Sequence, residues 1–186
     1  VEPFTGWRGP AHTLFTFGFD SGKYIAVSAE IRKEKGEEFS ALGGLFRQYE
    51  LMYVIGDEKD LIGLRANIRS NPVYLYPVKT DKEKIKALFR SMLDRAAALA
   101  EEPEFYHTVF NTCTTNLRTH VNELRKKKIP FEIRVLLPGY SDRIAFEAGL
   151  IDFEGTLEQA RERFRINSRS ECIPDSKRWS AKIRER

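Results

Sequence analysis

The sequence has few of the residues that bind metals or form disulfides. Its 186 residues include only two cysteines and three histidines. Two cysteines do not make the disulfide framework of a small secreted domain, and the Cys and His residues lack the spacing of zinc ligands. We therefore expect no structural disulfides, no metal and no other cofactor.

Long hydrophobic runs are also missing, and no apolar stretch approaches the length that spans a membrane. No signal peptide is visible, and the chain opens with Val1-Glu2-Pro3 rather than Met, so we expect a mature or excised piece of a longer protein. The hydrophobic fraction of 41% and the charged fraction of 31% are typical of a globular protein. We expect one domain over residues 1–186, with a core over 6–167 and a basic C-terminal tail over 168–186.

The charge excess is mild. The formal net charge is +4, which would suit an anionic membrane surface or a nucleic acid. However, Lys and Arg are interleaved with Asp and Glu, which favours an ordinary solvated surface. The sequence shows no nucleic-acid motif, so we expect no nucleic-acid partner, and we expect a monomer.

Alternating and helical patterns divide the chain into strands first and helices later. The expected strands are 12–19, 23–32 and 50–56, with further candidates at 61–68 and 73–78. A polar, Gly-rich loop is expected over 33–44. The expected helices are 80–100, one that begins near Cys113, 142–148 and 157–164. This order predicts an α+β domain.

The first two strands should form a hairpin whose register is set by its apolar faces. A three-residue loop, Asp20-Ser21-Gly22, pairs Phe17 with Ile25 and Phe15 with Val27, so that both apolar sets face one core. The loop sequence suits a type I turn with Gly in the left-handed position. A two-residue loop would place the two apolar sets on opposite faces.

Cys113 opens a helical segment, and we interpret it as a nucleophile. A helix N-terminus carries unpaired N–H groups and the positive end of the backbone dipole, and both favour a thiolate. His120 lies two turns along the same face, too far for a hydrogen bond, and His107 reaches Cys113 only if the chain turns back tightly. His12 is therefore the best candidate base. We assign no role to Cys172.

Continuing the hairpin register places His12 opposite Glu30, with Ser28 on the same face, where we expect Ser28 to be a supporting residue of the site. A carboxylate across from an imidazole can fix its tautomer and stabilise the imidazolium. Cys113, His12 and Glu30 thus form a candidate catalytic triad. Alternatively, His12 is a strand-end residue satisfied by backbone, and Glu30 serves only in a salt bridge. The alternative basic partners of Glu30 are Arg32, Lys33 and Arg65.

These residues complete a pattern that resembles the periplasmic domain of the Lnb-type bacterial lipoprotein N-acyltransferases. The matching segments are Ala11-His12-Thr13, Ser28-x-Glu30-x-Arg32, Tyr53 to Asp60, Val73 to Pro77, Asn111-x-Cys113-Thr114-Thr115 and Leu136 to Tyr140. Together they cover most of residues 6–167. One departure is Thr112, where that family often has a second Asn.

The order of His before Cys is similar to that of permuted papain-like enzymes, the group of the lecithin–retinol acyltransferases. The resemblance implies a Cys at the start of a helix, packed on a small antiparallel sheet that carries the His. It also implies acyl transfer from a phospholipid, through a Cys113 thioester, to the N-terminal amine of a lipoprotein. The location implied is a periplasmic, membrane-facing domain of a membrane-anchored protein. We expect Asn111, Thr112 and Thr114 to support the oxyanion together with backbone N–H groups.

Two other function classes stay open at this stage. A papain-like cysteine peptidase or amidase would use the same Cys-His pair, and a catalytically silent module would bind lipid through the basic surface. Leu42, Leu45 and Phe46 either line an acyl groove or belong to the core.

Overall fold

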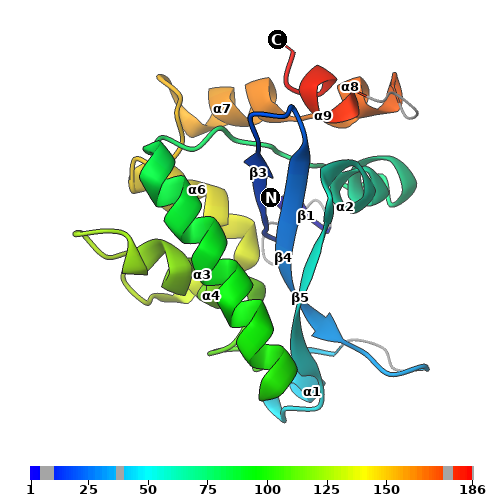
Figure 1. Cartoon of the computed structure of the whole chain (residues 1–186), viewed down its shortest axis with the longest axis vertical. Helices are drawn as coiled ribbons and strands as arrows, with labels where there is room; N and C mark the ends of the chain where they lie inside the picture. Colours follow the sequence, from blue (N-terminus) through cyan, green and yellow to red (C-terminus); the bar gives the residue numbers. More distant parts are fainter. Residues whose placement is uncertain (5–10, 37–39, 174–177, 186) are drawn as a thin grey trace.

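The computed structural model describes residues 1–4, 11–36, 40–173 and 178–185 and has the expected α+β architecture (Figure 1). Its larger sheet is antiparallel, with the order β3-β4-β5. A second, two-stranded antiparallel sheet pairs β1 with β2. The strands are β1 (Glu2–Pro3), β2 (Ala11–His12), β3 (Phe15–Gly18), β4 (Tyr24–Arg32) and β5 (Glu50–Asp57).

The hairpin of β3 and β4 has the predicted register. Phe15 pairs with Val27 and Phe17 with Ile25. Beyond this ladder the Phe19 N–H donates to the Lys23 carbonyl at 2.9 Å, which leaves residues 20–22 as the loop. Gly22 has φ +77°, the left-handed conformation that glycine adopts without steric cost. The three-residue loop is confirmed.

The strand expected over residues 12–19 is interrupted at Thr13 and Leu14. The β3–β4 ladder ends at the Phe15–Val27 pair, and His12 pairs with Glu2 across the β1–β2 ladder instead. The prediction that His12 pairs directly with Glu30 was therefore wrong. The segment that precedes Phe15 does not lie along the edge of β4, because β2 pairs with β1 instead.

Helices make up most of the remaining chain. The four predicted helices appear as α3, α4, α6 and α7. The complete set is α1 (Ala41–Leu45), α2 (Glu58–Gly63), the π-helix η1 (Leu64–Ile68), α3 (Lys82–Glu101), α4 (Cys113–Glu123), α5 (Ile133–Leu136), the 3-10 helix η2 (Pro138–Tyr140), α6 (Ser141–Glu147), α7 (Leu157–Phe164), α8 (Asn167–Glu171) and α9 (Trp179–Lys182).

The larger sheet lies between two helical layers (Figure 1). On one face, Phe17 and Val27 pack against Met92 of α3 and Leu117 of α4. Helix α2 and η1 lie on the opposite side of the sheet, where Ile62 is buried in a second apolar cluster. Both faces of β4 are thus covered, which accounts for its run of buried residues from Ala26 to Ala29.

Three sequence-based expectations were wrong in this region. Residues 61–68 form the end of α2 and η1 rather than a strand. Within 73–78, only Tyr74 and Val78 form isolated β-bridges, to Arg165 and Ile151. The loop expected over 33–44 contains α1, and its residues 37–39 lie outside the described residues.

The segment expected as a basic tail packs into the core. Trp179 is 2% exposed and Ile183 is 1% exposed, and both join the apolar cluster of Ile62. Arg184 forms an ion pair with the buried Glu58 of α2 at 2.5 Å. Residues 6–10 of the expected core, with 174–177 and 186 of the tail, lie outside the described residues.

Leu45 and Phe46 belong to the surface. Their exposed fractions are 42% and 79%, so the alternative that they belong to the core is wrong for both. The Leu42 side chain lies outside the described part of the structure. Of the helices in the described ranges, none combines the length and the apolar composition that a membrane crossing demands.

Candidate active site

Cys113 is the first residue of α4, and a capping box fixes this position. The Thr112 hydroxyl accepts from the Thr115 N–H at 3.2 Å, and the Thr115 hydroxyl accepts from the Thr112 N–H at 2.7 Å. The N–H groups of Cys113 and Thr114 lie in the first helical turn, where no intrahelical acceptor exists. They are therefore placed to bind a negative charge beside the sulfur.

The chain that leads into α4 is anchored on the edge of β5. The Leu51 N–H donates to the Glu104 carbonyl, and the Tyr106 N–H donates to the Tyr49 carbonyl, both at 2.8 Å. Cys113 then packs against Leu51 and other residues of one apolar cluster and is 8% exposed. The sulfur is thereby held rigidly against the larger sheet.

The His12 imidazole links Cys113 to the residues of β4. Its Nε2 lies 2.5 Å from the Ser28 Oγ and 3.2 Å from the Glu30 Oε1. Ser28 donates its hydroxyl proton to Glu30 at 2.9 Å, so its oxygen is free to accept from the His12 Nε2–H. Because Nε2 is engaged by Ser28 and Glu30, Nδ1 is the ring nitrogen that remains for the interaction of the imidazole with the Cys113 side chain.

The predicted proximity of His12 and Glu30 is therefore present, although β-pairing does not create it. Ser28, expected only as a supporting residue, stands between the two. Nε2 contacts both groups, so the carboxylate acts on the imidazole directly and also through the Ser28 hydroxyl.

The electrostatics of the site favour a thiolate–imidazolium pair. Burial alone would raise the pKa of Cys113, but the hydrogen bond and charge of His12 and the Thr13 N–H hold it below its usual range. Burial alone would lower the pKa of His12, but its hydrogen bonds to Cys113 and Glu30 raise it to about 9. The pKa of Glu30 falls to about 2 against the effect of burial, because His12 and Arg65 favour the carboxylate.

Arg65 is a buried residue that the sequence presented only as an alternative partner of Glu30. Its Nη2 lies 2.5 Å from Glu30, its Nε lies 2.9 Å from Glu2, and its Nη1 donates to the Leu61 carbonyl at 2.7 Å. Glu30 therefore makes both contacts at once, the ion pair with Arg65 and the contact with His12. A single arginine in the apolar run from Leu61 to Ile68 was the available signal, because a buried cation requires paired anions.

The proposed oxyanion-supporting residues differ in their contacts. The Asn111 amide donates to the Phe105 carbonyl at 3.0 Å and to Glu104 at 3.3 Å, so it mainly stabilises the turn before α4. The Thr112 hydroxyl is occupied by capping. The Thr114 hydroxyl lies 3.7 Å from the Cys113 sulfur. Of these three side chains, Thr114 is the one with a described contact to the reactive atom.

The remaining histidines have other partners. His107 Nδ1 accepts from the Val109 N–H at 3.1 Å, and His120 bonds the hydroxyls of Tyr53 and Ser91 at 2.8 and 2.7 Å. Burial lowers the pKa of His120. Across the described ranges, no group of three or more His, Cys, Asp and Glu residues is arranged to hold a metal ion.

Cys113 should label as an activated thiol. Because the pKa of Cys113 is lowered, its thiolate should persist at a pH where an ordinary thiol is already protonated. Iodoacetamide labelling should therefore continue in mildly acidic buffer and decline only at lower pH. We would measure the rate against pH in a Cys172→Ser variant, which leaves Cys113 as the single thiol. The added change His12→Ala should return the profile to that of an ordinary thiol. An ordinary profile in both variants would rule out the ion pair.

Comparison with known proteins identifies the domain that contains this site. The family model described as the Lnb N-terminal periplasmic domain matches residues 3–139. No curated protein and no solved structure matches the chain. The matched region contains His12, Ser28, Glu30, Arg65 and Cys113. It also spans most of the chain, so this protein belongs to the family of the Lnb N-terminal periplasmic domain.

Proposed function

We propose that the protein is a cysteine-nucleophile acyltransferase with a permuted papain-like arrangement. The observation that carries the proposal is the continuous set of hydrogen bonds from Cys113 through His12 and Ser28 to Glu30, at the start of a helix. A thiolate, a base, an orienting carboxylate and a helix N-terminus are together what acyl transfer through a thioester requires.

In the first half-reaction, the Cys113 thiolate attacks an ester carbonyl of a phospholipid. The resulting oxyanion lies beside the N–H groups of Cys113 and Thr114. When the intermediate collapses, the bond from carbon to the ester oxygen breaks, and the His12 imidazolium gives its proton to the leaving oxygen. A lysophospholipid departs and the acyl group remains on Cys113.

In the second half-reaction, an amine attacks the thioester. Neutral His12 takes the proton that the attacking amine loses, the bond from carbon to sulfur breaks, and the Cys113 thiolate and the imidazolium form again. The product is an amide. The acceptor that fits the family is the N-terminal amine of a bacterial lipoprotein, in a periplasmic reaction at a membrane to which the full protein is anchored.

Exposed aromatic residues near the start of α4 support a membrane surface as partner. Phe110 is 69% exposed and stacks on Phe131, which is 48% exposed, with ring centres 6.2 Å apart. The Arg118 guanidinium lies over the Phe131 ring, with its central carbon 5.6 Å from the ring centre. Apolar rings beside a cation suit the interface of an anionic bilayer. We propose that the domain acts there as a monomer and without a nucleic-acid partner.

The test is intact mass spectrometry after incubation with phospholipid vesicles. We expect a covalent acyl adduct on Cys113 that hydroxylamine removes, as it removes thioesters, and that an added lipopeptide amine discharges to form an amide. Cleavage of a peptide ester without any lipid adduct would instead establish a peptidase or amidase. An unreactive Cys113 together with vesicle binding would establish a silent lipid-binding module.

Graded variants separate the roles of the two partners of the imidazole. His12→Ala should remove the adduct, because it removes the base itself. Glu30→Gln should slow adduct formation less, by about 10- to 100-fold, because Glu30 only orients the base and stabilises its charge. Equal losses in the two variants would contradict this order.

A further inference from the structure

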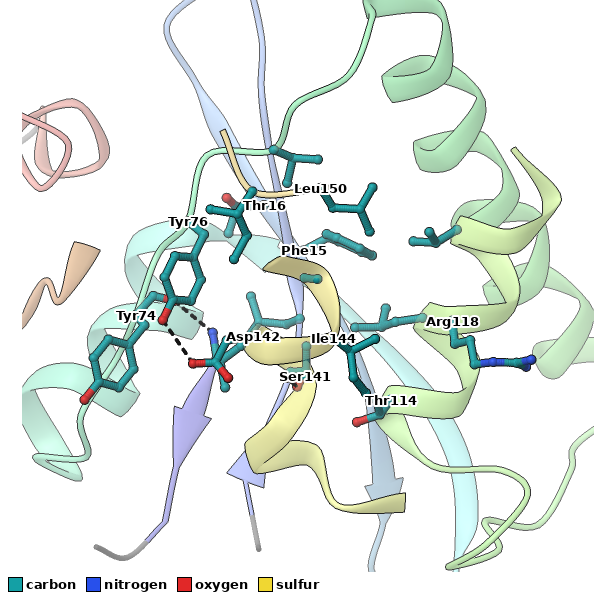
Figure 2. Close-up of a pocket in the computed structure, with 18 of the residues that line it drawn as sticks. Phe15, Thr16, Tyr74, Tyr76, Thr114, Arg118, Ser141, Asp142, Ile144 and Leu150 are labelled. Carbon is teal, nitrogen blue, oxygen red and sulfur yellow. Dashed lines mark hydrogen bonds between the residues drawn. The ribbon is translucent and has the colours of Figure 1, made fainter. Parts of the chain in front are cut away.

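An apolar cavity begins at the catalytic residues and continues away from them. Its volume is about 220 Å³, and His12, Thr13 and Thr114 line the end nearest the nucleophile. Thr114 is the immediate neighbour of Cys113, with 3.7 Å between its hydroxyl and the sulfur. Figure 2 shows Thr114 at one end of the cavity, Phe15 and Ile144 along it, and Leu150 at the opposite end.

The length of the cavity can be measured along the face of α4 that lines it. Thr114, Leu117, Val121 and Leu124 all line it, at the spacing of a single helical stripe. Ten residues along an α-helix span about 15 Å. That distance is about half the thickness of a bilayer's hydrocarbon core, which is the extent of one lipid acyl chain. No side chain of a peptide substrate reaches so far.

The charged groups on the wall are paired with other protein groups, so an ionic ligand is not required. Asp142 accepts two hydrogen bonds from Arg161, at 2.7 and 3.0 Å, and one from the Tyr76 hydroxyl at 3.2 Å (Figure 2). The other pairs among the described lining residues include the Val1 amine with the Tyr74 carbonyl, His12 with Glu30, Glu2 with Arg65, Lys84 with Asp81, Arg118 with the Pro130 carbonyl and Arg125 with the Ala148 carbonyl. What remains open to an occupant is largely aliphatic.

We propose that this cavity holds the acyl chain of the thioester formed on Cys113, with the carbonyl carbon beside Thr114 and the methyl end toward Leu150. The assignment rests on the proposed acyl transfer and adds its substrate class, a long unbranched acyl chain. The cavity measures chain length, because each methylene that enters it leaves water.

The test compares p-nitrophenyl esters of butyrate, octanoate, laurate and palmitate as acyl donors. In Val121→Phe, the added ring fills the cavity about 10 Å from Thr114 along α4. We expect unchanged acylation of Cys113 by butyrate and at least a tenfold loss with laurate and palmitate. Thr119→Phe, on an exposed position of the same helix, is the matched control and should keep the original profile.

A second pair of changes keeps the test decisive if Val121→Phe does not fold. Ala145→Leu should also shorten the preferred chain, because Ala145 lines the cavity from α6. Leu150→Ala should act in the opposite direction and improve palmitate relative to octanoate. An unchanged chain-length profile in all of the folded cavity variants would overturn the cavity assignment and leave the acyl-enzyme standing.

Binding without chemistry separates the two proposals. In a Cys113→Ser background, the fluorescent fatty acid parinarate should bind with the original cavity and lose at least tenfold in affinity with Ala145→Leu or Val121→Phe. If no ester acylates Cys113 while parinarate binds in this pattern, the proposed function fails, and the cavity remains a binding site for a fatty acyl chain that is not attached to Cys113. Equal parinarate binding in the cavity variants and in Thr119→Phe would refute the cavity.

Discussion

Replacing Cys113 with serine should abolish acyl-enzyme formation and reduce acyl transfer by at least about 1,000-fold. Serine keeps the size of the side chain, but its hydroxyl does not ionise under the conditions in which the His12 pair makes Cys113 a thiolate. Folding should change little, because Cys113 contributes one small side chain to a cluster that Leu51 and Leu99 dominate. We expect a loss of about 1 kcal/mol or less in the free energy of unfolding.

The measurement pairs transfer of a labelled acyl chain from phospholipid with thermal unfolding. Cys172→Ser is the matched control, because Cys172 is an exposed free thiol and should retain full activity. A large drop in melting temperature in Cys113→Ser, with activity per folded molecule unchanged, would mean that Cys113 is only a core residue.

The parts of the fold that follow from local patterns could be predicted from the sequence. The β3–β4 register depends on matching Phe15 and Phe17 to the apolar residues of β4, and one face of the sheet is indeed buried. Helix α4 begins where the dipole argument placed it, because Thr112 and Thr115 cap it reciprocally. Both features are local, and tertiary packing reinforced them.

The parts that failed depend on contacts between distant segments. The run from Leu61 to Ile68 has the apolar content of a strand, but Asp57 caps the α2 helix, whose Ile62 packs with Trp179 from the far end of the chain. The same packing explains why residues 179–183 are not a free tail. A composition rich in Lys and Arg indicated solvation, whereas Trp179 and Ile183 decide the position of this segment.

The candidate site shows the same division. The assignments of Cys113 and His12 came from helix geometry and elimination. Glu30 was placed near His12 by extending the β3–β4 register beyond Phe15, where the two strands are no longer paired. The structure reaches the same neighbourhood by a different path, with β2 paired to β1. The linking role of Ser28 depends on hydroxyl and imidazole positions that a strand pattern does not specify.

Replacing Arg65 should cost far more stability than replacing an exposed arginine. Arg65 is 5% exposed and bridges two carboxylates, Glu2 and Glu30, that are themselves 2% and 25% exposed at the side chain. Replacing it with methionine fills a similar volume but leaves two anions in a poorly hydrated environment. We expect a loss of about 3–5 kcal/mol in the free energy of unfolding, because an unpaired buried charge is far costlier than a missing contact.

Urea unfolding at neutral pH measures this loss. Arg32→Met is the matched control: Arg32 also pairs with a glutamate, Glu50, at 3.0 Å, but its side chain is 69% exposed, so the loss should stay within about 1 kcal/mol. Adding Glu2→Gln to Arg65→Met should recover part of the stability, since one stranded anion disappears. Equal losses for Arg65→Met and Arg32→Met would show that water reaches the two carboxylates. Glu30 would then be held beside Ser28 and His12 by the hydrogen bonds of those two residues alone.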